Sequence, residues 1–83
     1  MSKVLLSKAA EKFFLKLKPS DKKKIARGID RLSQNPLLGE KLKGQYEGLL
    51  KLRVWPYRII YRFTKGENLV EIVAIGHRQG IYN

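Results

Sequence analysis

Four basic side chains recur along the second half of the chain and point to chemistry on a phosphate. They are Lys51, Arg53, Arg58 and Arg62. Residues 50–54 and 57–63 alternate in polarity, as half-buried β-strands do, and the alternation places all four cations on one face. A planar guanidinium can bind two phosphate oxygens at once and stays charged when partly buried, which favours Arg58 as the main phosphate ligand. The spacing therefore predicts a cationic face that binds a phosphate-bearing partner.

The register of these two strands decides how close the cations lie. If a two-residue turn joins the strands, Arg53 lies opposite Arg58. Like charges directly opposite in a sheet are destabilising, so a purely structural protein would avoid this pair or place an acid between them. Glu71 is the only nearby candidate for such an acid. In the alternative interpretation, Arg58 stacks on Tyr57 or Trp55 and only stabilises the hairpin.

The residue types that are missing narrow the chemistry. The chain has no cysteine and a single histidine, which excludes disulfides, thiolate zinc sites and multi-histidine metal sites. Its seven acidic residues are scattered, so a two-metal nuclease lacks ligands. Cleavage of a phosphodiester would then be metal-free, which RNA permits because its 2′-hydroxyl is an internal nucleophile. Lys, Arg, His and Tyr can supply the base, the cations and the acid. We expect no metal and no cofactor.

Two further side chains near the C-terminus are candidates for the same chemistry. His77 could be a general acid or base, a platform for a nucleobase, or an ordinary residue at the end of a strand. Tyr82 could stack on a nucleobase or pack on the sheet. Tyr57 and Tyr61 alternate with the cations and so fall on the strand face that points to the core, and we interpret both as structural.

The overall charge points to a polyanionic partner. The 83 residues carry 18 Lys and Arg against 7 Asp and Glu, a formal net charge of +11. Lysines on the predicted helices, such as Lys12 and Lys16, favour a solvated face that aids solubility or steering. No apolar run approaches the ~18 residues of a membrane span, and Val4 to Leu6 is too short for a secretory signal. We expect a cytoplasmic protein that does not bind membranes.

The elements that must position these residues follow from the hydrophobic pattern. Strand 2–6 precedes a helix over 8–17 capped by Ser7, and a second helix starts at Ser20 or Asp21 and ends at Asn35. A loop over 36–48 leads to strands 50–54, 57–63 and 69–75. The order β-α-α-β-β-β predicts one α+β domain over residues 1–83, with an antiparallel sheet and a helical hairpin packed on one face. Close approach of the first helix would explain Gly28 in the second.

Two sequence blocks resemble the RelE/ParE toxin superfamily. Residues 41–61 (KLKG…GLLKLRVWPYRIIY) are similar to its K-L-x-G … Y-x-I/V-R-x-x-x-Y-R-I-I-Y block, and residues 75–82 (IGHRQGIY) to its closing I-G-H-R-x-x-V-Y. The resemblance covers essentially the whole chain. It implies the toxin of a toxin–antitoxin pair, and for RelE-type members a ribosome-dependent endoribonuclease. Such an mRNA interferase inhibits translation by cutting mRNA through its 2′-hydroxyl and leaves a 2′,3′-cyclic phosphate.

The resemblance also implies roles for single residues. Lys51 and Arg53 match basic residues of the family, and Arg58 matches its phosphate-stabilising arginine. Arg78 matches an arginine that is linked to transition-state charge or to protonation of the leaving group. Tyr82 matches a tyrosine that stacks on a base. Arg62 adds to RNA binding. Leu49 stands where the best-known member has a catalytic lysine, so the general base is Lys51 as first choice and His77 as second.

Other functions stay open. The ParE-like branch shares the fold, poisons DNA gyrase and cleaves nothing, and a non-catalytic nucleic-acid-binding module is a third class. The resemblance implies a cognate antitoxin, together with the ribosome and mRNA, as partners. Operator DNA would be contacted only indirectly, through the antitoxin.

Overall fold

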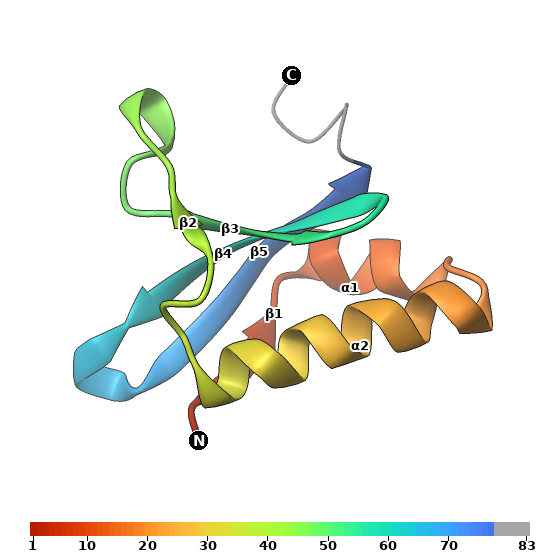
Figure 1. Cartoon of the computed structure of the whole chain (residues 1–83), viewed down its shortest axis with the longest axis horizontal. Helices are drawn as coiled ribbons and strands as arrows, with labels where there is room; N and C mark the ends of the chain where they lie inside the picture. The colour runs from red at the N-terminus through yellow and green to blue at the C-terminus, as the bar shows by residue number, and fades with distance from the viewer. Residues whose placement is uncertain (78–83) are drawn as a thin grey trace.

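The computed structural model describes residues 1–77 of the chain (Figure 1). Two helices and five strands account for most of them, joined by two short 3-10 helices. In chain order the elements are β1 (Lys3–Leu6), α1 (Lys8–Leu15), α2 (Pro19–Gln34), β2 (Glu40–Lys41), η1 (Gly44–Tyr46), β3 (Leu50–Val54), β4 (Tyr57–Thr64), η2 (Lys65–Glu67) and β5 (Leu69–His77). The α+β fold class predicted from the sequence is confirmed.

The five strands form one sheet in the order β1-β5-β4-β3-β2. The pairs β2–β3, β3–β4 and β4–β5 are antiparallel, but β1 lies parallel to β5. The sheet is therefore mixed, whereas we had expected an antiparallel sheet. Parallel neighbours need a long crossover connection, and here the whole chain from α1 to β4 separates the two strands. No local turn signal specifies such a pairing.

Both helices begin and end for local reasons. The Ser7 hydroxyl accepts a hydrogen bond from the Ala10 amide (3.0 Å) and caps α1, as predicted. The helix ends at Leu15, two residues before the predicted end, although Leu17 still packs against the core. The second helix begins at Pro19 itself. A proline is tolerated there because the backbone N–H groups of the first turn have no hydrogen-bond partner within the helix, so the N–H that proline lacks is not missed.

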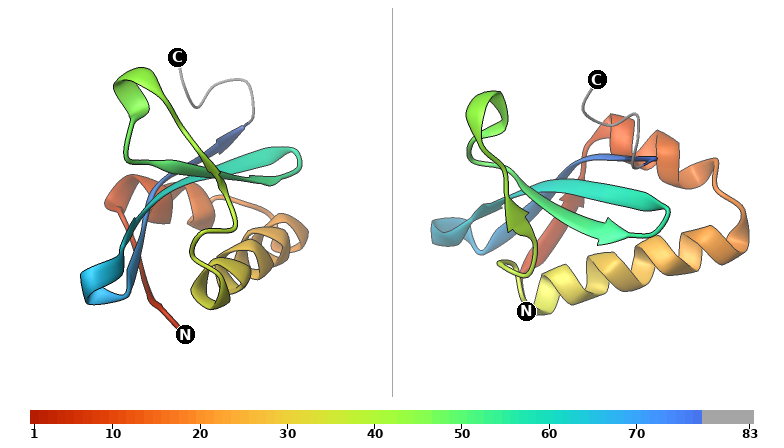
Figure 2. Two further views of the ribbon diagram at one scale, coloured as in Figure 1. Left: turned by 60° about the vertical axis from the view of Figure 1, so that its left-hand side comes forward. Right: turned by 45° about the horizontal axis from the view of Figure 1, so that its top comes forward.

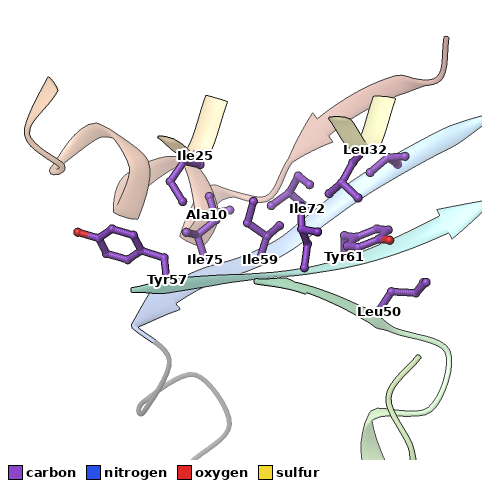
Figure 3. Close-up of a cluster of buried hydrophobic side chains, with 11 residues drawn as sticks. Ala10, Ile25, Leu32, Leu50, Tyr57, Ile59, Tyr61, Ile72 and Ile75 are labelled. Atoms are coloured by element: carbon purple, nitrogen blue, oxygen red, sulfur yellow. The ribbon is translucent and has the colours of Figure 1, made fainter. Parts of the chain in front are cut away.

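The core lies between the helices and one face of the sheet. Figure 3 shows Tyr57, Ile59 and Tyr61 of β4 directed toward Ile25 and Leu32 of α2, and all of these side chains are buried. In Figures 1 and 2 the two helices lie on the same side of the sheet. Neither α1 nor α2 covers the opposite face, and it is the face that the strand alternation assigns to the cations.

Gly28 marks the closest approach between α2 and the sheet. A Cβ atom at this position would lie 2.9 Å from Cγ2 of Val54 and 3.3 Å from Cδ1 of Ile59. We had expected the first helix to be the close neighbour. The structure shows instead that the close neighbour is the β3–β4 hairpin. Removing one side chain from α2 lets the helix lie near the strands that carry the cations.

Candidate functional site

The β3–β4 hairpin brings Arg53 and Arg58 side by side. Trp55 and Pro56 form the turn, with a cis peptide bond between them, and the register pairs Arg53 with Arg58. The pairing that we predicted from a two-residue turn is confirmed. Since register partners in an antiparallel pair point to the same face, both guanidinium groups lie on the sheet face away from the helices.

We call this surface the basic face and define it by Lys51, Arg53, Arg58 and Arg62. Neighbouring strand residues point the other way into the core: Leu50 and Leu52 are 7% exposed, and Ile59 and Tyr61 are fully buried. Arg53 and Arg62 are exposed, whereas Lys51 and Arg58 are half-buried. The apolar residues of the same strands hold the four cations in place on the opposite side.

Acidic residues lie at two positions beside the basic face. Glu71 on β5 is the register partner of Arg62. It is the acidic neighbour that we expected from the sequence. Glu40 on β2 is the register partner of Lys51 and was missed, because a two-residue strand leaves no alternation to detect. Register places each of these carboxylates beside an outer cation, while Arg53 and Arg58 face one another. Positive charge is therefore concentrated at the turn end of the hairpin.

A hollow opens at that end of the hairpin. It is lined by Arg53, Trp55, Tyr57 and Arg58. The Nε atom of Arg58 is buried, and the register partner of Arg58 on β5 is Gly76, which has no side chain. The hollow therefore combines two arginines with an indole that is 65% exposed. Sequence reasoning did not select Trp55 as a site residue, although its place between Arg53 and Arg58 at a predicted turn was a usable signal.

Tyr57 fastens the turn end of the hairpin to the helices. Its hydroxyl donates a 2.7 Å hydrogen bond to Oδ2 of Asp21 in α2, and its ring packs edge-on against Phe13, with centroids 5.9 Å apart. The hydrogen bond to Asp21 raises the pKa of Tyr57 above 10.0, with smaller contributions from burial and from the carboxylate charge. Arg58, the next residue in the chain, is thereby held on a fixed strand.

His77 does not join the basic face. It is the register partner of Tyr57, and the two rings make an edge-on contact with centroids 5.4 Å apart. Since Tyr57 points to the helix side of the sheet, His77 lies on that side, away from Lys51 and Arg58. The predicted positions Arg78 and Tyr82 lie outside the described residues.

The α2–β2 connection is held close to Lys51. The Tyr61 hydroxyl donates to the Pro36 carbonyl (2.8 Å) and accepts from the Gly39 amide (2.9 Å). A Cβ atom at Gly39 would lie 2.6 Å from the Lys51 carbonyl oxygen and 2.8 Å from the Tyr61 hydroxyl. Glycine is therefore required for this close approach, which places Glu40 beside Lys51.

Within residues 1–77, no group of three or more His, Asp or Glu side chains could hold a metal ion. No helix in the described part of the chain is long and apolar enough to cross a bilayer.

Comparisons with known proteins agree with the fold. The family model described as the ParE toxin of type II toxin–antitoxin system, parDE, matches residues 4–82. No curated protein matches the sequence. The chain is similar to a structure of the toxin–antitoxin complex RelBE2 from Mycobacterium tuberculosis, with 27% identity, a TM-score of 0.79, and coverage of 93% of this chain and 98% of that one.

Two further solved structures share the fold at lower identity. The isolated E. coli RelE toxin is 18% identical with a TM-score of 0.81, covering 99% of this chain and 92% of that one. A YoeB/ParE toxin from Agrobacterium tumefaciens is 20% identical with a TM-score of 0.79, covering 92% of this chain and 98% of that one.

Proposed function

Because the chain belongs to the family of ParE toxins of type II toxin–antitoxin systems, we propose that it arrests growth by cutting messenger RNA on the ribosome. The observation that carries this proposal is the pair of arginines, Arg53 and Arg58, which face one another and line one hollow. Two guanidinium groups at one place suit a phosphate that gains negative charge in the transition state.

The proposed reaction uses no metal. The 2′-hydroxyl oxygen attacks the adjacent phosphorus, the bond from phosphorus to the 5′-oxygen breaks, and the products are a 2′,3′-cyclic phosphate and a free 5′-hydroxyl. A base takes the 2′-hydroxyl proton and an acid protonates the leaving 5′-oxygen. Arg58 stabilises the charge on the phosphorane, and Arg53 and Arg62 bind neighbouring phosphates.

Lys51 is the better candidate for the base. It shares the basic face with Arg53 and Arg58, whereas the His77 ring contacts Tyr57 on the other side of the sheet. By resemblance, Arg78 would protonate the leaving group or stabilise charge, and Tyr82 would stack on a base.

A second candidate function is inhibition of DNA gyrase without nuclease activity. The match to the ParE family model favours it, because the ParE-like branch of the superfamily acts on gyrase. The two arginines and Lys51 on one face favour cleavage over this candidate, since a gyrase inhibitor needs no catalytic set. A non-catalytic module would bind RNA through the same face and leave it intact.

The deciding experiment compares Arg58→Ala with Lys12→Ala. Loss of one transition-state donor lowers a rate by about 10²–10³-fold, so Arg58→Ala should abolish growth arrest on induction. Lys12 is exposed on α1, outside the basic face, and its replacement should leave growth arrest unchanged. Arg58→Lys keeps the charge but not the planar fork, and should recover only part of the activity.

Primer extension on translated mRNA separates the candidates. Cuts at defined codon positions, absent in Arg58→Ala, are expected. Intact mRNA together with accumulating gyrase–DNA breaks would decide for the gyrase inhibitor, and equal toxicity of both alanine variants would argue against an active site on the basic face. Circular dichroism of each variant shows whether the protein is folded.

The cognate antitoxin is the partner that the comparisons support. Complexes of toxin with antitoxin are among the similar structures. We infer that an antitoxin with acidic patches covers the basic face, because the net charge of +11 favours such a partner. Contact with operator DNA would then be made through the antitoxin.

A further inference from the structure

We propose that Trp55 is a stacking platform for one nucleobase of the bound RNA, next to the phosphate held by Arg53 and Arg58. This inference rests on the proposed function for the identity of the ligand as RNA. It assigns to the β3–β4 turn a role in holding a nucleotide, in addition to the base-stacking role that the resemblance implies for Tyr82.

The position of the indole supports this role. Trp55 is the first residue of the turn, 65% exposed, and it lines the same hollow as Arg53 and Arg58. The turn lies at one end of the β3–β4 hairpin (Figure 1), where solvent reaches most of the indole. Both arginines lie within three residues of the indole along the chain, and cross-strand pairing keeps them at the turn.

The chemistry of the three side chains is that of a nucleotide site. A nucleotide has an aromatic base and a phosphate separated by one sugar, and an exposed aromatic ring beside cations can bind both parts. Stacking on an aromatic ring accepts every base because every base has a π-face, while the cations bind the backbone.

A protein partner is the main competing occupant. Tryptophan and arginine are also common anchors of protein interfaces, so Trp55 could instead insert into the antitoxin. The observations favour a nucleotide because two arginines stand beside the indole among the four residues that line the hollow, whereas the core of a protein interface is depleted of charged residues. Retained RNA binding together with lost antitoxin binding in a Trp55 variant would identify the protein partner instead.

The chain offers a direct probe, because Trp55 is its only tryptophan. The full-length protein would be titrated with a short 2′-O-methyl RNA, which cannot be cleaved through the 2′-hydroxyl, while tryptophan fluorescence is followed. An abasic oligonucleotide of equal length and charge is the control. Stacking predicts quenching and a blue or red shift with the RNA and little change with the abasic chain. Equal responses to both would overturn the proposal.

Variants extend the test to affinity. Trp55→Ala should weaken binding of a labelled 2′-O-methyl RNA by about 10-fold or more, and Trp55→Phe should retain much of the affinity. Leu37→Ala is the matched control, because Leu37 is similarly exposed (63%) and lies outside the hollow. Unchanged affinity in Trp55→Ala, with an unaltered circular dichroism spectrum, would refute the stacking role.

The two proposals fail in different ways. If Trp55 stacks on a base but the protein does not cleave RNA, quenching by RNA persists while primer extension shows no cuts. If the protein cleaves RNA without using Trp55, codon-position cuts depend on Arg58 but quenching is absent. Binding and cleavage are therefore scored by separate measurements.

Discussion

At the scale of single residues, the basic face depends on side chains that point away from it. Tyr57 is 8% exposed and joins β4 to α2 through its hydrogen bond to Asp21, while Arg58 follows it on the opposite face. One residue thus fixes the strand and the next presents a cation. The alternation of a β-strand couples the two, because any slip in register would exchange them.

Tyr57→Phe tests this connection. The variant loses the hydroxyl that donates to Asp21, and we expect it to lower the free energy of unfolding by about 1 kcal/mol. Growth arrest should persist, because the ring and the strand stay in place. Chemical denaturation at neutral pH measures the first effect and induced expression the second. A loss of toxicity with unchanged stability would show that the hydroxyl has a direct role in function.

The same hydroxyl gives a pH dependence with a definite sign. The hydrogen bond to Asp21 raises the pKa of Tyr57 in the folded protein above 10.0. The neutral phenol therefore contributes stability that is fully present below pH 10 and is lost as the pH rises through the raised pKa. The stability difference between wild type and Tyr57→Phe should shrink above pH 10 in denaturation experiments. Tyr61, whose pKa is raised by burial, is present in both proteins and does not affect the difference. A difference that stays constant up to pH 12 would contradict the assignment.

At the scale of elements, the α2–β2 connection is the least predictable part of the site and one of the most tightly packed. Pro36, Gly39 and the Tyr61 hydroxyl are joined by two hydrogen bonds, so a segment that looks like a loop in the sequence has a fixed path. That path ends in β2, where Glu40 pairs with Lys51. The surroundings of Lys51 therefore depend on a short strand and a buried tyrosine.

Gly39→Ala should disturb this arrangement. The new methyl group would lie 2.6 Å from the Lys51 carbonyl oxygen, a backbone atom that cannot move aside cheaply. We expect a loss of about 1–3 kcal/mol in the free energy of unfolding, typical of overpacking. Gly66→Ala is the control, because a Cβ atom there meets nothing within 4 Å. Equal melting temperatures for the two variants would mean that β2 does not pack against β3 as described.

At the scale of the whole molecule, the cations divide into two groups. Lys12 on α1 and Lys16 at its C-cap are exposed, and the basic face lies on the sheet surface that α1 and α2 leave uncovered. Both groups contribute to the net charge of +11 and attract a polyanion over a distance. Contact with individual phosphates is expected only at the basic face.

The salt dependence of RNA binding should separate these groups. Each phosphate contact on a single strand contributes about 0.7 to the slope of log affinity against log salt concentration. Arg53→Ala should reduce the magnitude of that slope by about 0.7, and Lys12→Ala should leave it close to the wild-type value. Fluorescence anisotropy of a labelled 2′-O-methyl RNA between low and physiological salt measures the slopes. Similar reductions in both variants would place the contact surface on the helices as well.

The sequence predicted the features that arise from short-range patterns. Periodicity identified both helices and the strands of the hairpin, and a two-residue turn was enough to pair Arg53 with Arg58. Features that depend on distant segments were missed or wrong: the parallel pairing of β1, the strand containing Glu40, and the neighbour of Gly28. No local pattern encodes which distant backbone comes to lie beside a residue.

For the site, amino-acid type and alternation by themselves determined that the chain carries a cationic face suited to phosphate. Only the tertiary structure decided which candidates share that face. It placed His77 with Tyr57 on the helix side and brought Trp55 into the hollow beside the arginines. The physical reason is that a strand fixes which side its own residues face, whereas contact between strands is set by packing of the whole core.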